Sequence, residues 1–308
     1  MITYSWRTVL DPGEERELRQ LLAEAAEEDA EAGFPRVSLD QPYGDDASHL
    51  IVRLLPDDRT GDHVRLAAYL RLEPDPGGGP ATARYVVRPE FRSRGISTLL
   101  LETIGLDMRA DGGWAGTGVR AMRIWARGDH PAAQRMARRF RESGVRPARR
   151  EWQLLAPLRA QGPAGGPVHA TARVLTGTAE MTELWRRHRR DEPPAKPTVM
   201  ITGAAADPTG AAWVDPHATE RTQYGTAGRI RAVLVDEASG NGEEIRRALL
   251  TAAMDCLEDH GLRVAAITVD AWDRGLARSC RLLGFMHDRT DTEYTIDNAP
   301  GRGNLSFT

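Results

Sequence analysis

A short basic turn that contains a glycine is the segment of this sequence best suited to chemistry. Tyr85–Thr98 reads Y-V-V-R-P-E-F-R-S-R-G-I-S-T, and an apolar-periodic segment that follows through Met108 predicts a helix. The first turn of a helix leaves backbone N–H groups unpaired, and the helix dipole favours negative charge there. The order strand, basic turn, helix therefore predicts a site for a phosphate or pyrophosphate.

Within this turn, Gly95 lets the backbone approach an anion closely, and Arg92 and Arg94 add positive charge. The alternative interpretation is an ordinary strand-to-helix connection. We predict that the following residues form the binding site: Tyr85, Val86, Val87, Arg92, Ser93, Arg94, Gly95, Ile96, Ser97 and Thr98.

The elements that must hold such a turn occur twice along the chain. A length of 308 residues suits two domains, and the Gly- and Pro-rich segment 162–167 is the best linker candidate. Each half reads as strand, amphipathic helix, strands, turn, helix, strand, helix and strand, more weakly in the second half. We therefore predict domains at 1–160 and 168–298. The stretch 193–228 shows few strand-like runs and predicts no clear element beyond Thr198–Thr202.

The basic turn resembles the acyl-CoA pyrophosphate loop of the GNAT acetyltransferases, whose pattern is Arg/Gln-x-x-Gly-x-Gly/Ala. Arg92, Gly95 and Ser97 occupy its three defined positions, with Ser97 as the one departure. The resemblance implies an α+β fold of two tandem GNAT domains, each with a central mixed sheet flanked by helices. It also implies acetyl-CoA as cosubstrate and a small-molecule amine as acceptor.

Residues 124–133 (I-W-A-R-G-D-H-P-A-A) extend the resemblance to the mycothiol synthase family of tandem-GNAT acetyltransferases. In that family the first domain holds acetyl-CoA in a largely structural role, and the second domain performs the transfer. Here the second loop, Glu237–Glu244, carries glutamates where a pyrophosphate would bind. Like charges at close range repel, so we expect one acetyl-CoA site, in the N-terminal domain.

The catalytic residues that the resemblance implies are replaced in both halves. A glutamate base is expected on the strand before the loop, and a tyrosine acid four residues before the late Gly-Phe. The first half has Arg84 and Phe140 at these places, and the second has Arg229, Arg231 and Cys280. Arginine stays protonated at neutral pH, and phenylalanine has no proton to donate. The general base and the general acid therefore remain unassigned from the sequence.

Several residues are alternative candidates for these roles, although each has a structural interpretation that we favour. His130 precedes Pro131 and suits a helix cap, Tyr85 suits packing in the sheet, and Cys280 suits a hydrophobic core. Asp129 is a further candidate in the first half. The carboxylates that could assist transfer are Glu73, Asp215 and Glu220.

Composition excludes other classes of function. A net charge of −3 leaves no excess of positive charge for a nucleic-acid binder. Two cysteines, no Cys/His cluster and scattered histidines predict a reducing, cytoplasmic location without a disulfide framework or a metal site. No apolar run is long enough to predict a membrane span. The oligomeric state cannot be inferred from the sequence.

Three functional hypotheses follow. The first is an acetyl-CoA-dependent N-acetyltransferase that acts on a small amine from the N-terminal domain. The second is a tandem-GNAT protein that binds acetyl-CoA without turnover, as a sensor or to stabilise a partner. The third is a mycothiol synthase with an unrecognised active site.

Overall fold

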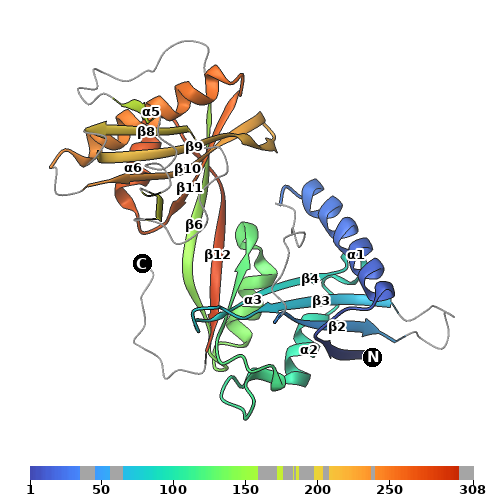
Figure 1. Cartoon of the computed structure of the whole chain (residues 1–308). Helices are drawn as coiled ribbons and strands as arrows, with labels where there is room; N and C mark the ends of the chain where they lie inside the picture. Colours follow the sequence, from blue (N-terminus) through green and yellow to red (C-terminus); the bar gives the residue numbers. More distant parts are fainter. Residues whose placement is uncertain are drawn as a thin grey trace. The chain divides into compact units, whose positions relative to one another are not determined.

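The chain folds into two compact units that are each closed by strands from distant parts of the sequence (Figure 1). The structure, a computed structural model, describes residues 1–34, 46–55, 65–158, 172–175, 183, 185–186, 198–203, 208–236 and 240–297. Unit 1 contains Met1–Arg149 and the chain from Asp291 onward, and unit 2 contains Arg150–Thr290. The predicted linker at 162–167 lies outside the described residues.

The units differ from the predicted ranges 1–160 and 168–298 because two strands pass from one unit to the other. β6 (Val145–Pro157) leaves unit 1, and its residues Glu151–Pro157 pair with β11 of unit 2. β12 (Met286–Ile296) returns, and its residues Thr292–Ile296 pair with β5 of unit 1. The last strand of the sequence therefore completes the first sheet.

Unit 1 contains a mixed sheet with the order β1-β2-β3-β4-β5-β12. Neighbouring strands from β1 to β4 are antiparallel, β4 and β5 are parallel, and β12 is antiparallel to β5. The strand bounds are β1 (Ile2–Arg7), β2 (Ser48–Leu54), β3 (Arg65–Glu73), β4 (Ala81–Val87) and β5 (Met122–Ala126).

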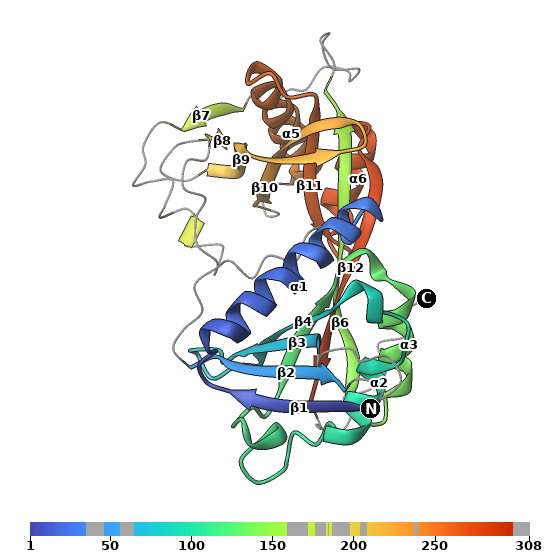
Figure 2. The same cartoon turned by 90° about the vertical axis from the view of Figure 1, so that its right-hand side faces the viewer.

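Helices cover both faces of this sheet (Figure 2). α1 (Pro12–Glu31) begins at a capping box formed by Asp11 and Glu14 and packs Leu21 and Ala25 on one face. α2 (Ile96–Ile104) and α3 (Pro131–Arg139) pack on the other. Three short 3-10 helices join the elements: η1 (Pro89–Phe91), η2 (Trp114–Gly116) and η3 (Arg127–Asp129). Because strand side chains alternate between faces, the sheet supplies an apolar surface to each layer.

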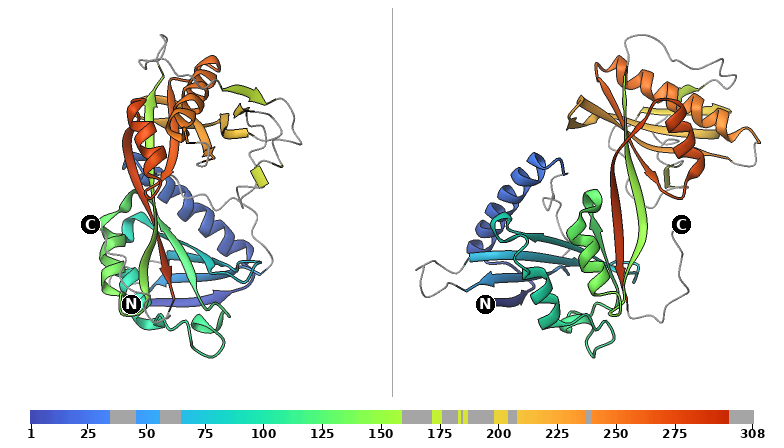
Figure 3. Two further views of the ribbon diagram at one scale, coloured as in Figure 1. Left: turned by 90° about the vertical axis from the view of Figure 1, so that its left-hand side faces the viewer. Right: turned by 180° about the vertical axis from the view of Figure 1, so that it is seen from behind.

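Unit 2 contains mixed strands in the order β6-β11-β10-β9-β8-β7. Figure 3 shows this unit from two further sides, with its two helices in orange and red. α5 (Gly242–Asp259) and α6 (Arg274–Leu282) pack on one face, and Trp185 lies against Trp213 on the other, with ring centroids 5.3 Å apart. The strand bounds are β7 (Arg173–Leu175), β8 (Thr198–Gly203), β9 (Pro208–Thr222), β10 (Gly225–Val235) and β11 (Val264–Asp270). The predicted α+β class with mixed sheets is confirmed.

The stretch that showed few strand-like runs, 193–228, contains β9 and the first residues of β10, which pair as a long hairpin. Its inner positions are small or apolar, as at Ala211, Ala212, Trp213 and Val214, and all four are buried. Alternation is absent over residues 210–216 because both faces of β9 are covered there, so the pattern of a half-exposed strand does not apply to them.

A buried histidine makes the stability of unit 1 dependent on pH. His49 on β2 has its Nδ1 2.6 Å from the Tyr69 hydroxyl, and burial, reinforced by the charge of Arg71, lowers the pKa of His49 below 6.5. The unfolded chain then binds the proton more readily than the folded chain. The stabilisation is complete above about pH 6.5 and decreases as the pH falls below that value.

We expect the urea midpoint to decrease between pH 7 and pH 5.5, and to decrease less in His49→Gln than in the wild type. An equal decrease in the two proteins would contradict a buried neutral His49.

Candidate functional site

The parallel strands β4 and β5 of unit 1 separate along their length. Their pairing joins Ala81–Ala83 to Met122–Ile124, whereas β4 continues to Val87 and β5 to Ala126. Beyond Ala83 and Ile124 the facing backbone groups of the two strands are therefore available to a third, extended group. The opening lies at the carboxyl ends of both strands, which is where α/β-type sheets bind ligands.

The basic turn lies at the end of β4 and leads directly into α2. Gly95 is the N-cap residue with φ of +78°, and Ser93 also has a positive φ, of +61°. Ser93, Arg94 and Gly95 are all exposed. Since glycine has no side chain to cap the helix, the N–H groups of the first turn face outward and can donate to an anion.

The two arginines of the turn have different surroundings. Arg92 donates through Nη1 to Asp29 Oδ1 of α1 at 2.7 Å and through Nε to the Val87 carbonyl at 3.2 Å. These contacts hold the turn against α1. The Arg94 guanidinium lies over the Phe91 ring at 5.6 Å from its centroid and is exposed, which makes it the arginine better placed for an incoming phosphate.

The remaining predicted residues support the turn from inside. The Tyr85 hydroxyl donates to Ser97 Oγ at 3.0 Å, and burial raises the pKa of Tyr85 to about 12. Tyr85 therefore links β4 to the first turn of α2 and keeps its proton at neutral pH. Thr98 Oγ1 lies 3.2 Å from the Met136 sulfur of α3. Val86 packs beneath α1, and Val87 and Ile96 belong to the opposite core.

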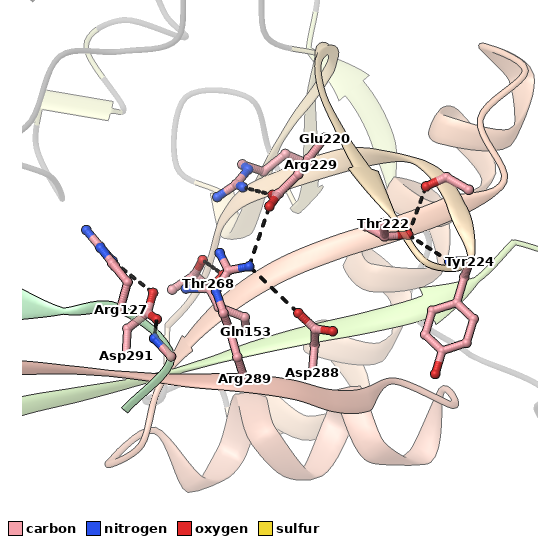
Figure 4. Close-up of polar contacts among 12 residues, drawn as sticks. Arg127, Gln153, Glu220, Thr222, Tyr224, Arg229, Thr268, Asp288, Arg289 and Asp291 are labelled. Atoms are coloured by element: carbon pink, nitrogen blue, oxygen red, sulfur yellow. Dashed lines mark hydrogen bonds and ion pairs between the residues drawn. The ribbon is translucent and has the colours of Figure 1, made fainter. Parts of the chain in front are cut away.

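The other side of the opening is a strained turn at the end of β5. Gly128 and Asp129 both have positive φ, +74° and +46°. Asp291 of β12, which is fully buried, accepts from the Gly128 N–H at 2.8 Å and from Arg127 Nη1 at 2.9 Å (Figure 4). Thr292 Oγ1 donates to Asp129 Oδ1 at 3.1 Å. The last strand thus fixes the conformation of this turn.

Asp291 and Thr292 were missed by sequence reasoning because no local signal links them to residues more than 160 positions earlier. The earlier candidates in this turn have structural contacts. His130 Nδ1 accepts from the Ala132 N–H at 3.1 Å, so His130 caps α3 as expected. Asp129 Oδ2 accepts from Gln134 Nε2 at 2.9 Å.

The chain is similar in sequence to curated mycothiol acetyltransferases. Mycothiol acetyltransferase of Nocardia farcinica is 29% identical over 97% of this chain and 99% of its own length. The enzyme of the same name from Thermobispora bispora is 29% identical over 77% of this chain and 80% of its own. No family model matches the chain.

Solved structures share the fold of this chain over nearly its whole length. A GCN5-related N-acetyltransferase from Sphaerobacter thermophilus has a TM-score of 0.58 at 17% identity, covering 97% of this chain and 96% of that one. A tandem GNAT protein from the clavulanic acid biosynthesis pathway has a TM-score of 0.58 at 15% identity, covering 98% and 100%. The chain has the fold of the tandem GNAT proteins. The predicted fold and the resemblance to mycothiol synthase are confirmed.

The first unit has neither of the two residues that the family resemblance predicts for proton transfer, the glutamate base and the tyrosine acid. Phe140 is buried in the core that α3 shares with the sheet. Arg84 on β4 is half-exposed, and its Nε lies 3.5 Å from Glu73 Oε2 of β3. Direct attack by an unprotonated amine, with water accepting its proton, remains compatible with this arrangement.

In unit 2 the parallel strands β10 and β11 also separate, but the helix that follows β10 begins with acidic residues. β10 and β11 pair in parallel from Ala227 to Ile230 and from Val264 to Ile267, and both strands continue beyond this pairing. α5 follows, with Glu243 and Glu244 in its first turn. Residues 237–239 of the loop lie outside the described residues. These carboxylates interact favourably with the helix dipole and occupy the place where a phosphate would need positive charge.

Cys280 of unit 2 is a core residue. It is fully buried on α6, and burial raises its pKa to about 12. A fully buried thiol that keeps its proton is poorly suited to act as a nucleophile. Cys256 on α5 is half-buried, and burial raises its pKa as well.

We expect an aromatic disulfide reagent to modify only Cys256 in the native protein and to reach Cys280 after unfolding. A Cys256→Ser variant isolates the second thiol. Rapid modification of that variant in native buffer would show that Cys280 is accessible.

Among the residues that the structure describes, no three His, Cys, Asp or Glu side chains are arranged to hold a metal ion. Over the same residues, no helix has the length and apolar composition needed to cross a membrane.

Proposed function

We propose that this protein is an acetyl-CoA-dependent N-acetyltransferase that acts on a small-molecule amine, with one acetyl-CoA bound in unit 1. The observation that carries the proposal is the opening between β4 and β5 directly beside the exposed N-terminus of α2. Backbone groups of the opened strands suit the extended pantetheine arm, and the turn at Ser93–Gly95 suits the pyrophosphate.

The charge at the two helix N-termini supports a single site. Arg94 stands at the start of α2, whereas Glu243 and Glu244 stand at the start of α5. At about 5 Å and an effective dielectric constant of about 20, each like-charge contact costs about 3 kcal/mol. The acidic helix is therefore the weaker site for a pyrophosphate.

Calorimetry with acetyl-CoA tests the site. We expect one molecule bound per chain, and at least tenfold weaker binding in Arg94→Glu. Arg19→Glu makes the same charge change at an exposed position on α1 and serves as the matched control. Equal affinity in all three proteins would contradict a site at the basic turn, and two equivalent molecules per chain would contradict the single site.

A second candidate is mycothiol acetyltransferase activity, which the similarity to curated relatives over nearly the whole chain favours. Mass detection of acetylated product from an amine panel that includes the mycothiol precursor separates the hypotheses. Product from the precursor alone favours the second candidate. No product from any amine, together with tight acetyl-CoA binding, favours a binding protein without turnover.

A further inference from the structure

Both units place an arginine at the point where the parallel strands separate. The last paired residue of β4 is Ala83, and the next is Arg84. The last paired residue of β10 is Ile230, and the next is Arg231, which lies in an irregularity of the β9–β10 ladder. The two arginines are thus equivalent in position, although the surrounding sequences differ.

Each arginine also contacts a carboxylate of the preceding strand. Arg84 Nε lies 3.5 Å from Glu73 Oε2 of β3, and Arg231 Nη2 lies 3.2 Å from Asp215 Oδ2 of β9. A lone carboxylate here could act as a base, but each of these is already shared with a guanidinium. An arginine guanidinium, paired with a carboxylate, therefore lies at the point of strand separation in each unit.

The Arg84 side chain of unit 1 has only a long contact to its carboxylate partner. Glu73 Oε1 contacts Arg71 Nη2 at 2.6 Å, and Arg71 is fully buried, so the carboxylate is held by that partner. The contact of Glu73 to Arg84 is longer than a charge-assisted hydrogen bond of about 2.8 Å, and the Arg84 side chain is 34% exposed. The Arg84 guanidinium is therefore accessible to a second anion beside the opening.

In unit 2 the corresponding arginine has a closer carboxylate partner. Arg231 Nη2 lies 3.2 Å from Asp215 Oδ2, and Asp215 is buried. Nearby on the same two strands, Glu220 contacts Arg229 at 2.6 Å, and it also contacts Arg289 at 3.5 Å (Figure 4). The longer contact of Arg84 to its carboxylate is therefore a feature of unit 1.

A second arginine shares this side of the unit 1 sheet. Arg123 of β5 is exposed, and its Nε donates to Thr82 Oγ1 at 3.2 Å. Thr82 and Arg84 lie two positions apart on β4, so their side chains point to the same face. Arg84 and Arg123 therefore flank Thr82 on the face opposite α2 and α3, at the closed end of the opening.

We propose that the acceptor of this acyltransferase carries a carboxylate close to its amine, as an α-amino acid does, and that Arg84, assisted by Arg123, binds that carboxylate. This inference rests on the proposed transfer in unit 1. The guanidinium groups recognise the carboxylate by paired hydrogen bonds. Their positive charge also disfavours an ammonium group nearby, which promotes the neutral amine without a carboxylate base.

The acetyl transfer forms one bond and breaks one. The neutral nitrogen attacks the thioester carbon of acetyl-CoA and forms the N–C bond. The C–S bond breaks, and CoA leaves as the thiolate. The proton lost by the nitrogen reaches this thiolate through water.

The test compares the twenty amino acids with the amines formed by removing their α-carboxylate. Binding to protein saturated with CoA is measured by ligand-observed NMR, which requires no turnover. We expect at least tenfold tighter binding of one or more amino acids than of the matched amine. We expect Arg84→Gln to abolish this preference and Arg84→Lys to retain part of it. Arg65→Gln, at an exposed position on β3, is the control that leaves it unchanged.

Equal binding of amino acid and amine, no binding of any amino acid, or a preference that survives in Arg84→Gln would each overturn the inference. Circular dichroism of each variant establishes that it is folded. The failure of the proposed function has a different signature, because the protein would then form no acetylated product or bind no acetyl-CoA even with the amino-acid preference intact.

Discussion

Replacement of Gly95 by aspartate is expected to weaken acetyl-CoA binding about 100-fold, while asparagine at the same position retains most of the affinity. A Cβ atom at Gly95 has no neighbour within 4 Å, so neither side chain clashes. Asparagine and aspartate both tolerate the left-handed conformation at φ of +78°. They have nearly the same shape, and the difference between the variants is therefore one negative charge.

That charge would lie within about 5 Å of a pyrophosphate on the α2 N-terminus. Repulsion at this distance is about 3 kcal/mol at an effective dielectric constant of about 20, which corresponds to about 100-fold in Kd. Calorimetry at low and high salt measures the effect, and screening should reduce it at high salt. Unchanged affinity in Gly95→Asp would mean that the cofactor binds elsewhere.

Replacement of Asp291 by alanine is expected to lower the free energy of unfolding by about 2–3 kcal/mol. Asp291 is fully buried and accepts from the Gly128 N–H and from Arg127. Its loss leaves the Gly128 N–H without this acceptor and removes a restraint on the strained Gly128–Asp129 turn. Asp291→Asn keeps an acceptor oxygen and should cost less.

The matched control is Asp297→Ala, which removes an ion pair to Arg146 in the same unit. The Asp297 side chain is 29% exposed, so we expect a loss below about 1 kcal/mol. Urea denaturation measures all three variants. An equal decrease in the free energy of unfolding in Asp291→Ala and Asp297→Ala would show that the contacts of Asp291 with the β5 turn contribute little to stability.

Short-range features of the fold could be predicted from the sequence because a few adjacent residues decide them. Asp11 and Pro12 mark the start of α1, and the turn at Arg92–Gly95 marks the start of α2. Helix caps and left-handed turns depend on backbone groups within one turn of the chain, so their residues lie side by side in sequence. β8 was predicted at Thr198–Thr202, whereas β9 and the start of β10 were missed, because burial on both faces of the first part of β9 removes the alternation that identifies a strand.

From the sequence by itself we predicted an anion site at the basic turn of unit 1, with positive charge at this turn and negative charge at the corresponding turn of unit 2, and we found that the expected base and acid are replaced. Only the tertiary structure decided that Arg92 pairs with Asp29, that Arg84 contacts Glu73 at the strand separation, and that Asp291 holds the β5 turn. These contacts depend on strand order and register across long loops, and the same residues could have met other partners in another register. Charge and turn type are local properties of the chain, whereas the pairing of charges is a property of the folded sheet.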